Sequence, residues 1–600
     1  MSKDGTWSLD ILYQGVDDPK LTADIASAEQ TVLAYKSAVD ALPSAEADIA
    51  ALSHEKTAAL IKEALLESEN LTLLTRRIMS YCHLRKATNA KDSAVSPISM
   101  KMMSLSASLS PWQVKLERFI GALPNLDSVI AADSLLTDYD FYLHQLKKDA
   151  SRRMSEEAEN VFARMNISGG SAWSDLFGYV SSLITCELDG KTYPLPAVRA
   201  MAVSEDAAVR KAAYEAELKS YENAKGPIAF ALNSIKQQVN TEAELRGYAD
   251  PLEMTLEDSR LSKASLDAMW QAIDEYLPLF RQYLRRKGEL LGHENGLPWY
   301  DILAPMGTPE GENAKLYTID EAHDYLVDHF SHFAPDMAEM MDRAFKEDWI
   351  DFYPHDGKRG GAFCSNLPFL GQSRILTNFT GEFSDLVTLS HELGHAYHGR
   401  QIESHRPLNT RYTMPVAETA SNFNELFIMN DAIKHAEGGY KLRLVESQIQ
   451  DCTQIIVDIL SRFLFEDEVI RRRKTEFLYP EQLEEIMLNA QKQAFGDGLD
   501  PDALHPYMWC CKSHYYSAGL SYYNFPYAFG GLLSRGLYAR YLEEGEAFLP
   551  KYRAFLKKTT IASCEEVAKV CDIDLTDPAF WRQGLEVIAE NIRWFMEETK

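Results

Sequence analysis

Two histidines and a glutamate within residues 391–398 have the types and spacing of a metal-dependent hydrolase. The stretch reads His-Glu-Leu-Gly-His-Ala-Tyr-His, and residues 385–390 before it carry apolar side chains at helical spacing. In a helix, His391 and His395 lie one turn apart on one face and can bind one metal ion together. Glu392 then lies beside the open coordination position, where it can take a proton from metal-bound water. The pattern predicts the chemistry of a zinc peptidase.

A catalytic zinc needs a third protein ligand while one position stays open for water. The pattern in which a third histidine follows six residues after His395 is not met, because that residue is Gln401. Glutamates at three nearby positions are the alternatives: Glu403, Glu418 and Glu425. Glu403 comes too soon, since it belongs to the same helix or to its end. The third ligand is therefore expected from a following helix.

Two prolines predict where that second helix begins. Pro407 disfavours helix at the residue before it, so residues 404–410 are predicted to be a break. Pro415 suits the first turn of a new helix. On that helix Glu418 and Glu425 are seven residues apart, two turns along one face. We predict Glu418 as the third ligand and Glu425 as the acceptor of the other ring N–H of a ligating histidine.

Three other histidines are weaker candidates for the site. His398 lies three residues beyond His395 and could compete for the metal, but the helix is expected to carry it past the ion. His355 and His405 could face the cleft, although histidines in such positions are more often at the surface.

The zinc motif and the segment after it resemble peptidase family M3, the metallopeptidases that include thimet oligopeptidase and oligoendopeptidase F. Residues 416–425 read Val-Ala-Glu-Thr-Ala-Ser-Asn-Phe-Asn-Glu, and the spacing from His395 to both glutamates matches the family pattern. Residues 358–364 (Lys-Arg-Gly-Gly-Ala-Phe-Cys) are similar to a glycine-containing segment of oligoendopeptidase F, and residues 514–530 resemble its aromatic C-terminal motif. The resemblance covers roughly residues 110–600; earlier residues match only in helical character.

The resemblance implies a mainly α fold with two helical lobes around a deep substrate channel and a small β-sheet near the zinc helix. It implies one zinc ion per chain near the channel floor, and a channel that admits short unfolded peptides. We expect an N-terminal helical region over residues 1–190, similar to oligoendopeptidase F from about residue 110. A catalytic peptidase domain is expected over residues 191–600.

Peptide hydrolysis also needs donors that stabilise the negative oxygen formed when water attacks the carbonyl. The resemblance places a histidine and tyrosines of the aromatic segment over the substrate, and His514, Tyr523 and Tyr527 are the candidates. If the segment is helical, both tyrosine hydroxyls can point the same way, although Pro526 works against that geometry. The thimet branch has more glycine here, whereas only Gly519 lies between His514 and the tyrosines. The remaining tyrosines are expected to be packing residues: Tyr515, Tyr516 and Tyr522.

The rest of the chain predicts helices with few interruptions. Helical patterns cover residues 19–70, continue to about 165, and resume over 205–246 and 263–292. The expected interruptions are a break at 169–173, a hairpin at 183–193 with Asp-Gly at its turn, a surface loop at 303–314 and a strand at 374–380. An edge of that strand beside the zinc site could hold an extended peptide by backbone hydrogen bonds, or the strand could only support the zinc helix.

Composition excludes several classes of protein. A formal net charge of −28 over 600 residues argues against binding nucleic acid or an anionic membrane surface. The N-terminus lacks the apolar core of a signal peptide, and no apolar run is long enough to cross a bilayer. The eight cysteines are scattered along the chain and are expected to be reduced, which points to the cytoplasm.

Together these patterns predict a zinc-dependent endopeptidase that hydrolyses internal bonds of short, unfolded oligopeptides. Glu392 would activate zinc-bound water and return the proton to the leaving amine, while His514 and one or both of Tyr523 and Tyr527 stabilise the oxyanion. One alternative is a zinc carboxypeptidase or dipeptidyl carboxypeptidase of related helical fold, which would need a basic group for the terminal carboxylate. The other is a non-catalytic peptide-binding protein, and the presence of Glu392 beside three ligands argues against it.

Overall fold

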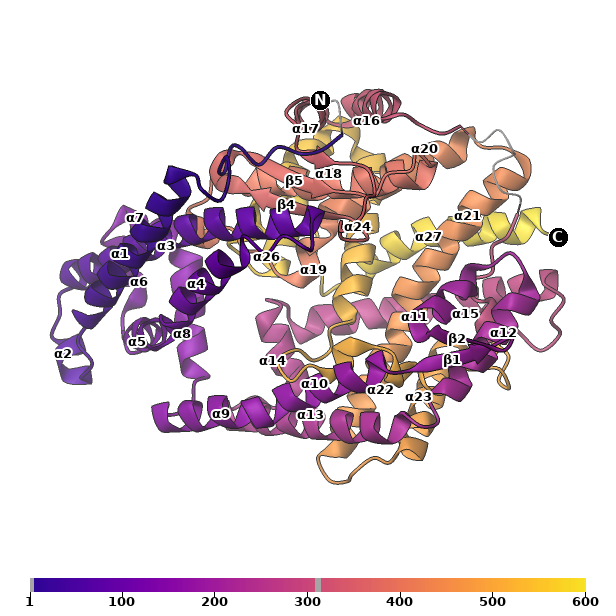
Figure 1. The fold of residues 1–600 in the computed structure, drawn as a ribbon, viewed down its shortest axis with the longest axis horizontal. Helices are drawn as coiled ribbons and strands as arrows, with labels where there is room; N and C mark the ends of the chain where they lie inside the picture. The colour runs from indigo at the N-terminus through magenta and orange to yellow at the C-terminus, as the bar shows by residue number, and fades with distance from the viewer. Residues whose placement is uncertain (1–4, 308–314) are drawn as a thin grey trace.

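The computed structural model describes residues 5–307 and 315–600, and most of this chain is helical. The expected mainly α fold with a small sheet near the zinc helix is confirmed. In Figure 1 the zinc helix α18 (Phe383–Ile402) and its sheet lie in the upper half, and α10 (Gly170–Ser182) and α13 (Lys225–Leu245) lie in the lower half. This arrangement agrees with the two helical lobes that we expected.

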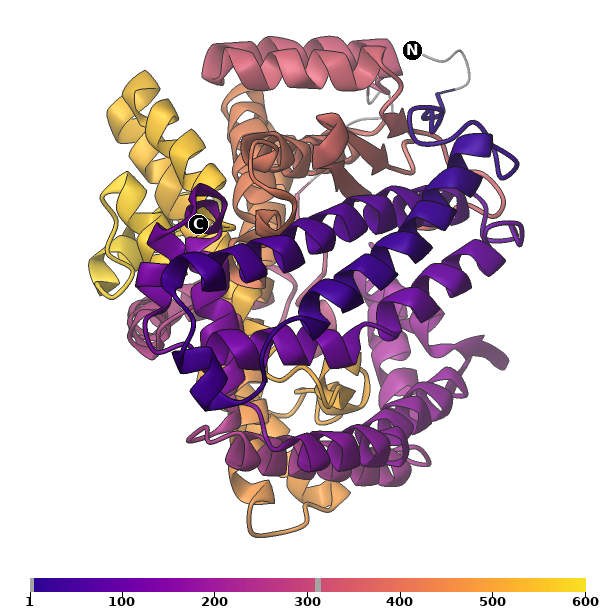
Figure 2. The same ribbon diagram turned by 90° about the vertical axis from the view of Figure 1, so that its left-hand side faces the viewer.

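The N-terminal helices form one packed group with its own apolar core. Their bounds are α1 Pro19–Asp40, α2 Glu46–Ala50, α3 His54–Thr88, α4 Ser96–Ala107, α5 Ser110–Gly121, α6 Leu126–Ala131, α7 Ser134–Asp138 and α8 Asp140–Ser151. Leu367 and Leu376 from the sheet are buried in the same core, so these helices also support the strands beside the zinc helix. Figure 2 shows this indigo group facing the viewer.

A second apolar core holds the lower lobe together. Its elements are α10, β1 (Thr185–Leu188), β2 (Lys191–Pro194), α11 (Leu195–Arg199), α12 (Ala207–Ser220), α13, α22 (Ile459–Arg473) and α23 (Pro480–Phe495), and α9 (Glu156–Ser168) leads into it. β1 and β2 pair antiparallel around a turn at Asp189 and Gly190, both with positive φ. The predicted hairpin is thereby confirmed.

The largest core lies around the zinc helix. Its other elements are α14 (Pro251–Asp258), α15 (Lys263–Leu290), α16 (Ile319–Phe333), α17 (Pro335–Lys346), α19 (Met414–Ala417), α20 (Thr419–His435), α21 (Gly438–Thr453), α24 (Phe525–Glu544), α25 (Leu549–Lys558), α26 (Cys564–Ala568) and α27 (Pro578–Glu598). A π-helical turn, η5 (Gln454–Asp458), joins α21 to α22. The helices expected over residues 205–246 and 263–292 are present as α12, α13 and α15, with a short break inside the first range.

The interruption expected over residues 169–173 is wrong in extent. Only Gly169 lies outside a helix, and α10 begins at Gly170. The side chain of Gln238 explains the early start, because its Oε1 accepts a hydrogen bond of 2.7 Å from the Gly170 N–H. A Cβ on Gly170 would lie 2.4 Å from the Ala518 Cβ, so glycine is needed for this close approach rather than for a loop.

The three-stranded sheet beside α18 has the order β3-β5-β4, with β3 (Ile350–Asp351) parallel and β4 (Phe363–Leu367) antiparallel to β5 (Gln372–Leu376). The strand predicted at 374–380 corresponds to β5, which ends at Leu376. Of the two roles left open for this strand, holding a peptide along its own edge is excluded, because β5 pairs on both sides. β4 pairs with β5 alone among the described strands, so the edge next to the zinc helix belongs to β4.

Three other expectations concern the chain as a whole. Residues 308–314 of the predicted 303–314 loop lie outside the described residues. All eight cysteines have free thiols in the structure, as expected. No helix among the described residues is long and apolar enough to cross a membrane.

Candidate metal centre

The zinc helix begins at a capping box. Asp385 Oδ2 accepts hydrogen bonds from the backbone N–H groups of Thr380, Gly381 and Glu382, at 2.7, 2.9 and 3.2 Å. The Glu382 carboxylate in turn satisfies the backbone N–H at Asp385. These contacts satisfy donors that a helix start leaves without partners, and an acidic residue there is favoured by the helix dipole. They fix where α18 starts and therefore which face carries the histidines.

A glycine inside the motif lets the next helix approach closely. A Cβ on Gly394 would lie 2.6 Å from the Ala420 carbonyl oxygen. Any residue larger than glycine would therefore push the two helices apart. Asn424 of α20 donates a 3.0 Å hydrogen bond to the Ser390 carbonyl of α18. The two helices therefore cross almost backbone to backbone, and this contact brings Glu418 over the histidines.

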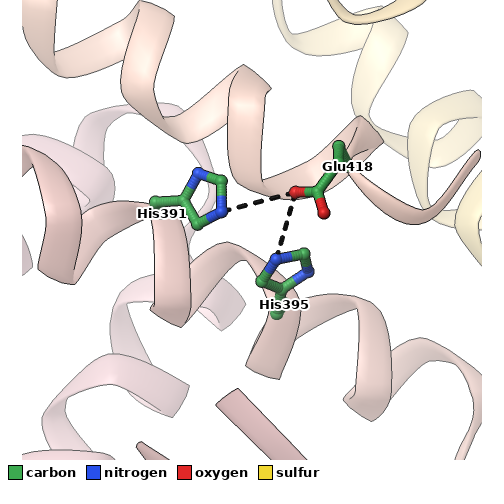
Figure 3. Close-up of side chains that lie close together, drawn as sticks. All are labelled: His391, His395 and Glu418. Carbon is green, nitrogen blue, oxygen red and sulfur yellow. Dashed lines mark ion pairs between the residues drawn. The ribbon is translucent and has the colours of Figure 1, made fainter. Parts of the chain in front are cut away.

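His391, His395 and Glu418 converge on one point, as Figure 3 shows. Glu418 Oε2 lies 3.3 Å from His391 Nε2 and 3.2 Å from His395 Nε2. Donors of a tetrahedral zinc site with bonds of about 2.0–2.1 Å lie about 3.3 Å apart. Two imidazoles and a carboxylate are also a ligand set that zinc prefers. The residues present therefore fit a zinc ion bound by these three side chains.

The local structure around Glu418 differs from the expectation. A short helix, α19, begins at Met414 with Pro415 in its first turn, but this helix ends at Ala417, and α20 begins at Thr419. Glu418 itself (φ −91°, ψ 9°) lies at the junction, so it and Glu425 do not share one continuous helix. The junction is held by Ser421, whose hydroxyl donates 2.8 Å to Glu418 Oε2. The bend lets the Glu418 side chain reach the histidines while α20 packs against α18.

Glu425 and Glu392 lie around the three donors. Glu425 Oε1 is 2.8 Å from His391 Nδ1, the contact that the sequence predicted, and it leaves Nε2 of that ring facing Glu418. Glu392 is buried, and its Oε2 has no hydrogen-bond partner in the described protein. A buried carboxylate oxygen without a donor costs free energy unless water or a substrate supplies one. Glu392 therefore has capacity left for a water molecule.

The pKa shifts of the histidines and glutamates show that positive charge is stabilised at this site. Burial raises the pKa of the Glu392 carboxyl above its ordinary value, although the two neighbouring histidines lower it. Burial alone would lower the pKa of His391, but its hydrogen bonds to Glu418 and Glu425 outweigh this and raise it to about 10. Contacts with both histidines hold the pKa of Glu418 far below its usual range despite burial. A divalent cation at the same point would satisfy all of these groups.

The weaker histidine and glutamate candidates lie away from the three donors. His398 is fully buried, shares a 2.8 Å hydrogen bond with Thr559 and stacks on Tyr412 with ring centroids 4.2 Å apart. Its pKa is lowered to about 3, chiefly by burial. His405 is bonded to Thr560, and His355 is exposed. Glu403 caps the end of α18.

The aromatic segment brings the expected histidine and tyrosines into one row. The hydroxyl of Tyr527, on the first turn of α24, donates 2.8 Å to that of Tyr523, which precedes the helix. The Tyr523 ring lies 5.9 Å from the His514 ring between centroids. Burial and the charges of Arg462 and Lys512 lower the pKa of His514 to about 3, so its imidazole is neutral. Tyr515, Tyr516 and Tyr522 are buried, as expected for packing residues.

A cavity of about 1070 Å³ opens onto the metal centre. His391, Glu418 and Glu425 line it, and Tyr527 approaches it from α24. The cavity is bounded by α18, α20, α21 and α24, so several distant parts of the chain meet there. It is large enough for several residues of an extended peptide, since it exceeds the usual volume of a small-molecule pocket.

Sequence reasoning missed two groups around this centre. Asn366 of β4 donates 3.1 Å to the His395 carbonyl and so ties the sheet to the zinc helix. Arg462 and Lys512 lie close enough to His514 for their charges to act on it, and Arg199 lines one small cavity with both of them. Lys512 could have been found from the sequence, because it lies only two residues before the predicted donor His514. The arginines come from distant helices, and no local pattern marks them.

A mainly helical fold with a His-Glu-x-x-His helix and a third acidic donor defines a metallopeptidase. The sequence matches peptidase family M3 over residues 200–587 and the family of oligopeptidase F over residues 124–185. The chain therefore belongs to peptidase family M3, and the expected metalloendopeptidase of this family is confirmed.

Individual proteins agree with this family. The chain is 25% identical over 533 residues to oligopeptidase PepF of Bacillus subtilis (strain 168), an alignment that covers 86% of this chain and 78% of that protein. The fold is similar to a crystal structure from Chlamydophila abortus, with a TM-score of 0.81, 19% identity and coverage of 100% and 98% of the two chains. Oligoendopeptidase-F from Enterococcus faecium gives a TM-score of 0.65 at 18% identity, over 96% and 97%.

Proposed function

We propose that this protein is a zinc-dependent oligoendopeptidase that hydrolyses internal bonds of short, unfolded peptides. The observation that carries the proposal is the convergence of His391, His395 and Glu418 beside the unsatisfied carboxylate of Glu392. The names of the relatives, oligopeptidase and oligoendopeptidase F, support the same substrate class. A peptide must enter the cavity as an extended chain, so folded proteins are excluded by their bulk.

The three donors would hold zinc. Bound there, the ion would lower the pKa of a water molecule and polarise the scissile carbonyl. Glu425 fixes the ring of His391 through its 2.8 Å contact with Nδ1, which keeps Nε2 available as a ligand atom. This arrangement supports a metal site on the face of α18 that lines the cavity.

Glu392 acts as the general base and then as the general acid. Its carboxylate takes a proton from the attacking water, and the water oxygen bonds to the scissile carbonyl carbon. The same carboxyl then gives the proton to the amine as the carbon–nitrogen bond breaks. Burial raises the pKa of Glu392, which makes its carboxylate a stronger base toward the attacking water.

The row of aromatic donors serves the developing oxyanion. Tyr527 lines the cavity with the proposed metal-binding side chains, and its hydroxyl donates to that of Tyr523. Burial raises the pKa of Tyr527 well above its ordinary range, so its hydroxyl keeps its proton and can donate. His514 is neutral and can donate through one ring nitrogen, while its Nε2 has no partner in the described protein.

Cleavage mapping in peptides of graded length tests the proposed function. We expect internal cleavage of short peptides, no cleavage of a folded protein, and loss of cleavage when a chelator is present. Mass spectrometry of the products identifies each bond that is cut. Release of only the last one or two residues from every peptide would instead establish a carboxypeptidase or dipeptidyl carboxypeptidase. Binding without cleavage would establish a non-catalytic protein.

Removing the tyrosine hydroxyls tests the oxyanion donors. Tyr527→Phe and Tyr523→Phe leave the rings in place, and His514→Ala removes the third donor. A donor that bonds the oxyanion acts mainly in the transition state, so kcat should fall by about 100-fold with little change in KM. Steady-state kinetics on zinc-loaded variants measures both constants.

Tyr522→Phe is the matched control, because the Tyr522 hydroxyl donates to Asp467 at 2.9 Å and is buried. This variant should keep its turnover even if its Tm falls. Wild-type turnover in all three donor variants, with zinc bound and the fold intact, would assign the aromatic row to packing.

A further inference from the structure

A second cavity, of about 160 Å³, adjoins the metal-centre cavity and is lined by cationic side chains. Gln454, in the π-helical turn η5, lines both cavities and so marks the wall that they share. π-Helical turns inside α-helices are often found at functional sites. The cations come from separate elements: Arg199 from α11, Arg210 from α12, Arg462 from α22, and Lys512 from the segment before His514.

The arginines of this second cavity are all neutralised by carboxylates. The pairs are Arg199 with Glu217 at 2.6 Å, Arg210 with Asp301 at 2.7 Å, and Arg462 with Asp458. His293 also contacts Asp301, and His505 contacts Glu217. The charges of these groups therefore cancel one another without help from a ligand.

Lys512 is the exception. Its ammonium group forms no hydrogen bond or ion pair within the part of the chain that the structure describes, although it lines the cavity. Burial and the charge of Arg462 lower the pKa of Lys512, because the charged form lacks both water and a partner. The Nε atom of Arg462 is likewise buried and without a partner. Two donors thus remain unsatisfied around one small space, and an anion would satisfy both.

The size and lining of the cavity limit which anion fits. Water occupies about 30 Å³ per molecule, so the space corresponds to about five waters, or one small chain end. One uncompensated cation matches a single negative charge. The other lining side chains include apolar ones that suit a residue's own side chain: Val198, Trp299, Leu303 and Met508. A carboxylate attached to one amino-acid residue meets all three conditions.

A row of side chains leads from the metal-centre cavity toward Arg462 and Lys512. Tyr527 lines the first cavity, its hydroxyl bonds Tyr523, and the Tyr523 ring lies beside His514. His514 feels the charges of both Arg462 and Lys512. A peptide that runs along the aromatic row from the metal centre therefore arrives at the cationic end.

We propose that Lys512, with Arg462 beside it, binds a carboxylate of the peptide substrate, in the first place the C-terminal one. This carboxylate site, called the anchor below, fixes the distance from the peptide's C-terminus to the bond that is cut. The position of cleavage is therefore a set number of residues from that end. This inference rests on the proposed function, since it assigns a binding site for the same substrates. A carboxylate of an Asp or Glu side chain has the same chemistry and is the second source.

Matched peptides with a free C-terminus or a C-terminal amide test the anchor. Wild-type protein should cleave the acid with a kcat/KM about ten- to one-hundred-fold higher than the amide, because a charge-assisted hydrogen bond to a partly desolvated cation is lost in the amide. The difference should lie mainly in KM, as expected for an interaction made equally in the ground state and the transition state. Lys512→Met should cleave both peptides like the amide.

The position of cleavage separates the two carboxylate sources. Peptide acids lengthened only at the N-terminus should be cut at the same bond counted from the C-terminus, and Lys512→Met should scatter the cuts. Peptide amides with one internal Glu should be cut at a fixed distance from that Glu if the side-chain carboxylate is the ligand. Lys346→Met, which changes an exposed lysine paired with Asp342, is the control and should behave like wild type.

Binding separates failure of the anchor from failure of the proposed function. Glu392→Gln protein should bind a labelled peptide acid about ten-fold or more tightly than its amide in fluorescence anisotropy, whether or not the wild-type protein cleaves peptides. Equal affinity and equal cleavage of acid and amide would overturn the anchor and leave the peptidase in place. Tighter binding of the acid without any cleavage would overturn the peptidase and keep the carboxylate site. If Lys512→Met does not fold, Lys512→Gln and the wild-type comparison give the same decision.

Discussion

Glu392→Gln is expected to lower kcat at least about 100-fold while zinc stays bound, because general acid–base catalysis contributes about 10²–10⁴-fold. Glutamine has nearly the same shape but cannot accept a proton from the attacking water. The metal-binding side chains are unchanged, so metal analysis should still find one zinc per chain. Burial disfavours the charged form of Glu392, and the Tm of the variant should therefore equal or exceed that of the wild type.

Glu403→Gln is the matched control for this prediction. Glu403 follows the same helix, α18, but its side chain is exposed and lies outside the three metal donors. It should keep wild-type kcat, KM and zinc content. Loss of zinc in Glu392→Gln would show that Glu392 supports the metal site. Full turnover in that variant would remove Glu392 from the mechanism.

The convergence of His391, His395 and Glu418 could be predicted because these residues are close together in the sequence. Two histidines one helical turn apart must share a face. The break predicted near Pro407 lets the chain turn back, so that the next helix packs beside the first and brings Glu418 to the histidines. The bend at Glu418 could not be predicted in this way. It depends on the approach of α20 to Gly394, where a Cβ would meet the Ala420 carbonyl, and this is a contact between helices rather than a local preference.

The sheet shows a different limit of sequence patterns. Alternation of side chains predicted a strand near residues 374–380, and β5 is present at Gln372–Leu376. The pattern within one strand does not say which strands pair with it. The central position of β5, and an edge of β4 that no other described strand pairs with, are seen only in the structure. If the peptide pairs with a strand edge, that edge belongs to β4, which follows Gly360 and Gly361.

The residues that line the second cavity are even farther apart in the sequence. Arg199 and Arg462 are more than 250 residues apart in the sequence, yet they line one space with Lys512. Each arginine is unremarkable alone, and only their carboxylate partners show that Lys512 is left without one. A basic group for a terminal carboxylate could not be located in the sequence, and the proposal for Lys512 depends on the packed fold.

Metal removal should have the largest effect on activity. Protein dialysed against a chelator is expected to retain less than about 1% of its peptidase activity, because without the ion the attacking water keeps a pKa near 15.7. One equivalent of zinc per chain should restore the activity. His395→Ala and Glu418→Ala should each lower the zinc content measured by metal analysis, since each removes one of three ligands.

His398→Gln distinguishes the ligands from their neighbour on the same helix. The His398 ring faces Thr559 and Tyr412 rather than the three donors, and glutamine can keep a hydrogen bond to Thr559. We expect this variant to bind zinc like the wild type when circular dichroism shows that it is folded. If a folded His398→Gln protein loses zinc while Glu418→Ala keeps it, the third ligand is His398 and the assignment of Glu418 is wrong. Full activity in metal-free wild-type protein would remove the metal from the mechanism altogether.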